Sequence, residues 1–353
     1  MGIFRKNGGG SNAASMLYDE RGFLNVPRID REANISDINF IVIIGGRQVG
    51  KTYGCIDLML SDKRNFILMR RTMTEVDFIC SNINNPLSVH KKYDTSIKKD
   101  SDYTGAIWLT EGEEKKQIGA LMSLSSVAKI RGFAGEVYTD LIFDEFIPET
   151  HVSRIRAEGD AFLNAIVTIS GNRELEGKKP LRTWLLANSN NLNSPILSAL
   201  GIMEKVERMK AAEQEVSTMK DRGIMIILPS SEELQKKRKK TSLFRAIDPD
   251  SVFARMAFGN DFAYNDASNI KPVRLAEYLP QFTTGQFTYY KHKSRPEYYV
   301  SDHTAGGCPV YPPTERGKVK CLRDNPNVKR RYYDGKVYFE SQTVKERFLD
   351  YFE

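Results

Sequence analysis

A regular alternation of apolar runs and mixed stretches starts near residue 38. Residues 38–44 are almost wholly apolar and rich in β-branched side chains. Such a run is typical of a parallel strand that is covered on both faces. Similar runs occupy 66–69, 141–143 and 183–187, and stretches with helical spacing lie between them. Strands that alternate with helices predict an α/β domain with a mostly parallel sheet, and we place it at residues 37–200.

The pattern changes on both sides of this domain. Residues 1–36 are predicted to be a flexible leader and entry segment, because their first part is small, polar and rich in glycine. Residues 201–264 include a helical stretch and the basic run 236–240, which indicate a connector. Residues 265–353 contain many tyrosines, several short strand-like runs and a closing helix near 344–352. They predict a smaller α+β domain at the C-terminus.

Composition narrows the classes of protein. With 353 residues, two compact units are expected. Fifty-two Lys and Arg against 45 Asp and Glu leave a net charge of +7, which suits a polyanionic partner.

The four cysteines form no CxxC pair, so neither a zinc ribbon nor a disulfide framework is indicated, and a reducing cytoplasm is the simpler interpretation. A zinc site from His292, His303, Cys308 and Cys321 has no familiar spacing. No apolar run approaches the ~20 residues that span a bilayer, so we expect a soluble protein without a membrane partner.

Residues 45–52 match the phosphate-binding pattern GxxxxGK[ST] directly after a buried strand and before a helical stretch. In such a loop, successive backbone N–H groups and the positive end of the helix surround a phosphate. We therefore expect the segment to bind ATP. Lys51 is predicted to neutralise the β- and γ-phosphates, and the Thr52 hydroxyl to ligate Mg²⁺. The full set of predicted ATP-binding residues is Gly45, Gly46, Arg47, Gln48, Val49, Gly50, Lys51 and Thr52.

Polar residues end two of the later strands. Asp144 and Glu145 follow the apolar run 141–143, and Asn188 follows the run 183–187 with Ser189 next to it. We predict that Asp144 helps to bind magnesium and that Glu145 polarises the attacking water. Asn188 is a candidate sensor of the γ-phosphate.

Basic residues supply two further expectations. Hydrolysis needs a cation for the charge that develops in the transition state, and the candidates are Arg47, Arg70, Arg71 and Arg173. Lys129 and Arg131 are candidate contacts to a DNA backbone, although a solvated loop explains them equally well.

Taken in order, these segments resemble the DNA-packaging ATPases of phi29-type phages, which are related to terminase large-subunit motors. The resemblance rests on the strand at 40–44 with its phosphate loop, Phe66-Ile67-Leu68-Met69-Arg70-Arg71, Leu141-Ile142-Phe143-Asp144-Glu145-Phe146, Asn172-Arg173-Glu174 and Leu186-Ala187-Asn188-Ser189. It covers most of the chain after the glycine-rich leader.

The resemblance implies an additional-strand, conserved-glutamate (ASCE) ATPase domain and a homomeric ring, a pentamer in this family, at the portal of a procapsid. It implies ATP and Mg²⁺ as cofactors, double-stranded DNA as a partner, and a place in the host cytoplasm. Arg173 becomes the favoured arginine finger acting in trans. The C-terminal domain would be a vestigial RNase H-like nuclease that holds the motor to the portal or to a packaging RNA. Asp302, Asp324 and Asp334 show no strand-end arrangement of the kind an active nuclease needs.

Other functions stay open at this level. A P-loop helicase or another nucleic-acid-dependent ATPase shares every residue of the nucleotide site, and so does a terminase-like motor with an active nuclease. A small-molecule kinase does not require a basic, tyrosine-rich appendage. A structural phage protein with a decayed site is disfavoured by the intact set Lys51, Thr52, Asp144 and Glu145.

Overall fold

The computed structural model describes residues 17–129, 133, 135–148, 155, 157–188, 194–247 and 269–352. The chain divides into two compact units. The first comprises residues 1–192 and 205–263, and the second comprises residues 193–204 and 264–353. Each unit is described by itself.

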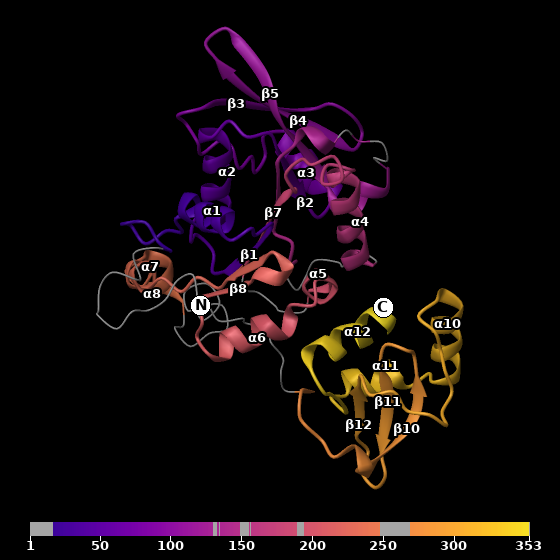
Figure 1. Cartoon of the computed structure of the whole chain (residues 1–353). Helices are drawn as coiled ribbons and strands as arrows, with labels where there is room; N and C mark the ends of the chain where they lie inside the picture. The colour runs from indigo at the N-terminus through magenta and orange to yellow at the C-terminus, as the bar shows by residue number, and fades with distance from the viewer. Residues whose placement is uncertain are drawn as a thin grey trace. The chain divides into compact units, whose positions relative to one another are not determined.

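A nine-stranded sheet organises the first unit, in the order β3-β4-β5-β2-β6-β7-β1-β9-β8 (Figure 1). The six consecutive strands β5, β2, β6, β7, β1 and β9 run parallel to one another. The strands at the two edges, β3 and β4 on one side and β8 on the other, pair antiparallel with their neighbours. β7 stands between β1 and β6. The strands are β1 (Phe40–Gly45), β2 (Phe66–Arg70), β3 (Asp94–Lys99), β4 (Thr104–Glu111), β5 (Glu114–Ser123), β6 (Asp140–Asp144), β7 (Arg182–Asn188), β8 (Val216–Met219) and β9 (Ile224–Ile227).

Both faces of this sheet are covered. Ile41 and Ile43 of β1 share a core cluster with apolar residues of α1, α2 and α3. On the other face Phe143 of β6 stacks on Phe162 of α4, with ring centroids 6.0 Å apart. Covering on both faces explains why the parallel strands are apolar at successive positions. The helices are α1 (Val26–Ile35), α2 (Lys51–Ser61), α3 (Met73–Cys80) and α4 (Glu158–Ser170), followed by the later helices α6 (Met203–Ala211), α7 (Glu232–Arg238) and α8 (Ser242–Ala246).

Local sequence sets the helix starts. Asn25 caps α1 by accepting a hydrogen bond from the backbone N–H of Arg28, and a proline stands in the first turn. Thr72 and Glu75 form a reciprocal capping box at the start of α3. These caps satisfy N–H groups that have no partner inside the helix.

The structure corrects two predicted boundaries. Residues 17–36 are not all leader, because α1 buries Val26, Ile29 and Ala33 against the core of the first unit. Residues 201–264 are not only a connector, because β9 pairs with β1 and β8 pairs with β9. β9 consists of four buried apolar residues, so it extends the sheet instead of linking two domains. The strands β3, β4 and β5 were not predicted either; β4 pairs antiparallel with both of the others, and β5 joins them to the parallel sheet through β2.

The second unit contains a four-stranded sheet in the order β10-β11-β12-β13, in which only β12 and β13 run parallel. Aromatic rings fill its core, and Phe348 of the last helix packs on Phe339 at 5.3 Å. The strands at 289–290, 298–300 and 336–339 and the closing helix are close to their predicted places. The elements are α5 (Pro195–Ala199), β10 (Tyr278–Thr283), β11 (Thr288–His292), β12 (Tyr298–Ser301), α10 (Glu315–Asp324), α11 (Val328–Tyr333), β13 (Val337–Phe339) and α12 (Gln342–Phe352).

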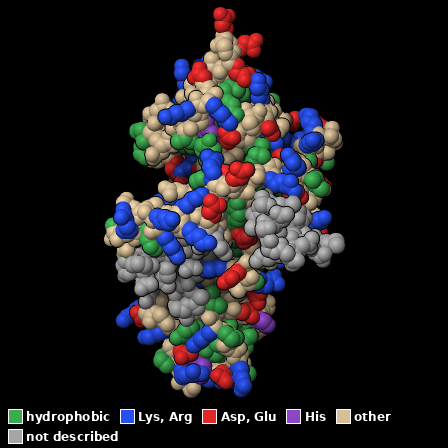
Figure 2. All heavy atoms as spheres, turned by 90° about the vertical axis from the view of Figure 1, so that its left-hand side faces the viewer, with side chains coloured by type: hydrophobic (Ala, Val, Ile, Leu, Met, Phe, Trp, Pro, Cys, Tyr) green, Lys and Arg blue, Asp and Glu red, His purple; other side chains and the backbone are tan. Residues whose placement is uncertain are grey.

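One face of the molecule can be examined for the distribution of charge. Figure 2 shows basic and acidic side chains interspersed on the face in view, so the net charge of +7 does not gather in one patch there. None of the helices in the described ranges combines the length and the apolar character needed to cross a membrane.

Candidate nucleotide site at the carboxyl ends of the strands

The phosphate-binding pattern forms the turn between β1 and α2. Gly50 caps α2 with a φ of 91°, in the left-handed region that favours glycine. A Cβ atom on Gly50 would also lie 3.3 Å from the Cβ of Phe23. Gln48 has a φ of 58°, which a residue with a side chain rarely adopts. The loop is therefore held in a strained shape that suits the binding of a phosphate by backbone N–H groups.

Lys51 is buried inside this loop. Its Nζ donates hydrogen bonds to the carbonyl oxygens of Gly45 and Gly46, at 2.9 and 2.8 Å, and to Oδ1 of Asn188, at 3.1 Å. Asn188 reaches Lys51 because β7 pairs with β1 so that Asn188 lies beside Gly45. The candidate sensor thus contacts the lysine, whereas Ser189 lies outside the described residues.

Thr52 in the first turn of α2 contacts Asp144 at the end of β6. The Thr52 hydroxyl donates a hydrogen bond of 2.8 Å to Oδ1 of Asp144, the last residue of β6. Both groups carry oxygen atoms, which are the ligands that Mg²⁺ prefers, and the backbone-lined loop stands beside them. The residues present therefore fit a nucleoside triphosphate with its magnesium ion. Glu145 follows directly, with a backbone φ of 58° and a half-exposed side chain.

Arg70 connects the acidic residues of the site. It ends β2, and its guanidinium donates to Asp144 at 2.8 Å, to Glu145 at 2.5 Å and to Glu75 at 3.2 Å. Burial would lower the pKa of Arg70, but the surrounding carboxylates raise it, so the group stays charged. From the sequence, Arg70 was predicted as one of four candidate cations and belonged to a segment that resembles packaging ATPases. The signal available from sequence was its position directly after the apolar run 66–69, whereas the pairing of β2 with β6 is visible only in the structure.

Arg173 is not placed as a trans arginine finger. Only 3% of its surface is exposed, and its guanidinium donates to the backbone carbonyl oxygens of Ser170, Gly135 and Tyr138. A finger must present its N–H groups to a nucleotide bound by another subunit. In this structure Arg173 instead fastens the end of α4 to the short helix η3 (Gly135–Val137).

The other candidate basic residues have separate environments. Arg71 is buried and forms a bidentate ion pair with Glu158, at 2.7 and 3.1 Å. Arg47 is exposed in the phosphate loop. Lys129 is exposed at the end of the short helix η2 (Leu124–Lys129), with Nζ 5.0 Å from the ring centroid of Tyr103. Arg131 lies outside the described residues.

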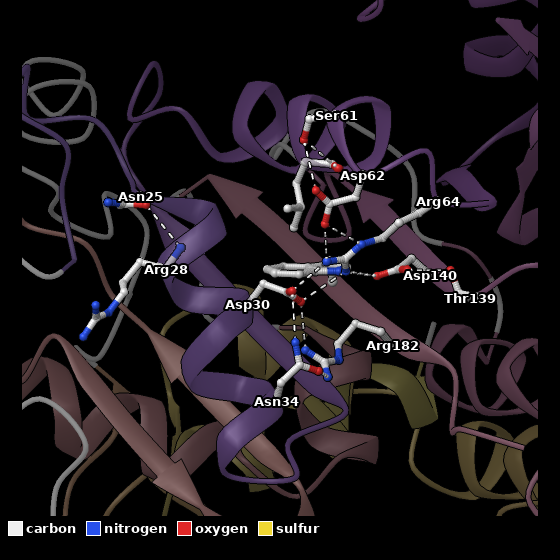
Figure 3. A network of polar contacts seen from close by, with 12 residues as sticks. Asn25, Arg28, Asp30, Asn34, Ser61, Asp62, Arg64, Thr139, Asp140 and Arg182 are labelled. Carbon is white, nitrogen blue, oxygen red and sulfur yellow. Dashed lines mark hydrogen bonds and ion pairs between the residues drawn. The ribbon is translucent and has the colours of Figure 1, made fainter.

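A charged network occupies the opposite, amino ends of the strands. Asp30 of α1 lies between two guanidinium groups, accepting from Arg64 at 2.7 Å and from Arg182 at 3.0 Å (Figure 3). Asp140 starts β6 and accepts from Nε1 of Trp184 at 3.1 Å. Burial raises the pKa of Asp140, although Arg64 opposes this shift. The network links α1 to the amino ends of the strands, so it lies at the opposite edge of the sheet from the candidate nucleotide site.

Comparison with known proteins identifies a family for this chain. The family model of the podovirus DNA encapsidation protein (Gp16) matches residues 18–277. No curated protein matches the chain significantly.

Three solved structures are similar. The structure titled "The Phi-28 gp11 DNA packaging Motor" is 17% identical, with 92% of this chain and 97% of that chain covered and a TM-score of 0.64. "The bacteriophage Phi-29 viral genome packaging motor assembly" is 19% identical, with 93% and 99% covered and a TM-score of 0.62. The crystal structure of the N-terminal domain of the DNA packaging ATPase from bacteriophage phi29 is 21% identical, with 57% and 95% covered and a TM-score of 0.44.

The first two structures show that the fold of both units is shared with phage packaging motors. The family model covers well over half of the chain. The chain therefore belongs to the podovirus DNA encapsidation protein (Gp16) family and serves the packaging of a viral genome.

Proposed function

We propose that this protein is an ATP-driven translocase of double-stranded DNA, in which Lys51, Thr52, Asp144 and Glu145 hydrolyse ATP. The observation that carries the proposal is the hydrogen bond between Thr52 and Asp144 beside the contact of Lys51 with Asn188. It brings residues from three strand ends to one phosphate-binding loop. Such convergence has no purpose in an ordinary turn between a strand and a helix.

Each residue has a distinct task in this reaction. Lys51 neutralises the β- and γ-phosphates, and the backbone N–H groups of residues 45–50 hold them. Glu145 orients a water molecule and accepts its proton while the water oxygen bonds to the γ-phosphorus. The bond between that phosphorus and the bridging oxygen breaks, and ADP and phosphate leave. A magnesium ion held by Thr52 and Asp144 would neutralise the charge that develops on the phosphate oxygens.

The strand order supports an ASCE ATPase domain. β7 separates the loop-bearing β1 from β6, which ends in Asp144 and is followed by Glu145. This additional strand sets the end of β6, and with it Glu145, one strand further from β1. It also brings Asn188 to Lys51.

The larger assembly is part of the proposal. We propose a homomeric ring, a pentamer as the resemblance implies, that acts on DNA at the portal of a procapsid in the host cytoplasm. Membership of the encapsidation family and the similarity to two structures titled as packaging motors support the packaging role. We assign the second unit to attachment, either to the portal or to a packaging RNA. A nuclease role is not favoured, because the three aspartates considered from sequence do not share partners. Asp324 accepts a hydrogen bond from Tyr311, Asp334 pairs with Lys336, and Asp302 pairs with His303.

The proposal is tested by the steady-state ATPase rate of wild type and Lys51→Ala, each with and without double-stranded DNA. We expect a DNA-stimulated rate in wild type and its loss in Lys51→Ala. Lys63→Ala is the matched control, because Lys63 is an exposed lysine that pairs with Glu111. Glu145→Gln should bind ATP and turn it over slowly.

Two outcomes would count against a DNA motor. Equal ATPase rates in wild type and Lys51→Ala would show that the loop does not support hydrolysis. A rate in wild type that is indifferent to DNA, even with procapsids present, would favour a P-loop enzyme of another kind, and DNA strand separation would favour a helicase.

A further inference from the structure

The second unit brings together three side chains that can ligate a metal ion. Asp302 and His303 follow β12, and Glu340 follows β13. Because β12 and β13 are parallel, with Val300 beside Phe339, their carboxyl ends lie at the same edge of the sheet. One ligand atom from each of the three residues lies within 4.8 Å of the others. No other group of this kind occurs in the part of the chain that the structure describes.

The surrounding hydrogen bonds hold these side chains in position. Ser301 is fully buried, and its hydroxyl donates to Oε2 of Glu340 at 2.7 Å. The backbone N–H of Asp302 donates to the same oxygen at 3.1 Å. Oε1 of Glu340 is then 3.4 Å from Nδ1 of His303. Oδ1 of Asp302 lies at the same distance from that nitrogen.

The backbone of the loop is also anchored. The N–H of His303 donates to the Ser301 hydroxyl, and the Tyr290 hydroxyl donates to the carbonyl oxygen of His303, each at 3.1 Å. These contacts hold the three ligand atoms close together. Pre-positioned ligands reduce the ordering cost of metal binding.

The charge of the cluster favours a cation. Among the described residues, the ion pairs of Asp302 and Glu340 are with His303 and with neither lysine nor arginine. Two like charges held this close repel each other, and a divalent cation between them removes that repulsion.

The ligand types select the ion. One imidazole nitrogen with two carboxylate oxygens suits zinc or a similar transition metal better than calcium or magnesium, which prefer oxygen alone. Asp302 and His303 are exposed, so water can complete the coordination. This set differs from the zinc site considered from sequence. Of those four residues only His303 takes part, while His292 faces Glu277 and Cys321 is buried in the aromatic core.

The geometry points to a binding site for one divalent transition-metal ion of the zinc class, ligated by Asp302, His303 and Glu340, with Ser301 as a positioning residue. The site belongs to the second unit and does not depend on ATP. The ordinary alternative is a protonated His303 that pairs with both carboxylates and binds no metal.

Binding of Co²⁺ distinguishes a metal site from an ion pair without metal. Co²⁺ can replace Zn²⁺ in protein sites, and its visible absorption depends on the ligands that bind it. Full-length protein without nucleotide is titrated with Co²⁺, and the absorption is then competed with Zn²⁺. We expect one equivalent to give bands that Zn²⁺ abolishes and Mg²⁺ does not. The bands should be lost in His303→Ala and in Glu340→Gln. Asp334→Asn, which removes an exposed carboxylate of the same unit, should leave them unchanged.

Ser301→Ala provides a second test, because it keeps all three ligands and removes the hydroxyl that positions two of them. This hydroxyl donates to Glu340, accepts from the backbone N–H of His303 and lies 3.1 Å from Nδ1 of His303. Loss of such a contact weakens metal binding about 10- to 100-fold. Circular dichroism of the metal-free variants checks that they fold. The proposal is overturned if wild type shows no cobalt bands, or if His303→Ala binds Co²⁺ as tightly as Asp334→Asn does.

Discussion

The guanidinium of Arg70 lies 2.5 Å from the carboxylate of Glu145 and also donates to Asp144. In this arrangement Glu145, the proposed general base, is ion-paired with Arg70. Oδ2 of Asp144, the proposed magnesium ligand, also accepts a hydrogen bond from Arg70. Glu145 cannot orient water freely while this contact persists. These contacts predict that Arg70 restrains hydrolysis until the site rearranges.

Removal of Arg70 should uncouple hydrolysis from DNA. In Arg70→Ala we expect the ratio of the DNA-stimulated to the basal ATPase rate to fall several-fold, because Glu145 is released without DNA. Arg70→Lys should be intermediate, since an ammonium group does not reproduce the forked contact with two carboxylates. The measurement is the steady-state ATPase rate with and without DNA. An unchanged ratio in Arg70→Ala would contradict the restraining role.

Arg173→Ala should act on stability. The substitution leaves the carbonyl oxygens of Ser170, Gly135 and Tyr138 without their buried donor. We expect the free energy of unfolding to fall by about 2 to 3 kcal/mol, measured by chemical denaturation. Mixing Arg173→Ala with Glu145→Gln subunits should not restore ATPase activity. Normal stability together with restored activity in a co-assembled mixture would return Arg173 to the role of a trans finger.

Asp30→Asn should destabilise the first unit. Asp30 pairs with Arg64 and Arg182, whose side chains are largely buried. Removing the charge leaves two poorly solvated cations, which we expect to cost about 3 kcal/mol. Asp62→Asn is the control, because Asp62 pairs with Arg64 from an exposed position and should cost less than about 1 kcal/mol. Equal losses in the two variants would show that burial of Asp30 does not matter.

His90 should make stability depend on pH. Its ring is buried and stacks on Tyr53 at 4.3 Å. Burial lowers the pKa of His90, although Asp57 opposes this shift. A lowered pKa means that the unfolded chain takes up the proton first. The free energy of unfolding should therefore fall as pH drops below about 6.5 and stop falling below the folded-state pKa.

Chemical denaturation between about pH 7 and pH 5 checks this, with His90→Phe as the comparison because it keeps the stacked ring. The variant should lose this part of the pH dependence. The same slope in both proteins would assign the effect to other groups.

Local pattern was sufficient for the centre of the site. The loop at 45–52 follows β1, Asp144 and Asn188 end β6 and β7, and these positions agree with the predicted strands, while the roles of the residues stay predictions. Each signal lies within one strand and the turn after it. The strands of the central sheet were recognisable for the same reason. Short apolar runs in a chain of mixed composition are typical of buried strands.

Contacts between distant segments were beyond the sequence. Only pairing of β2 with β6 brings Arg70 to Glu145, and only the packing of η3 against α4 buries Arg173. β9 is too short to be assigned without β1 beside it. Convergence of His303 and Glu340 depends on the parallel register of β12 and β13.

The sequence by itself therefore determined the phosphate loop and the residue types that follow each strand, since these depend on neighbours along the chain. Tertiary structure decided which of those residues meet, because strand order and burial bring together side chains from separate elements. Arg70 shows this most clearly: its charge is evident from sequence, but its partners, Asp144 and Glu145, follow from its place at the end of β2.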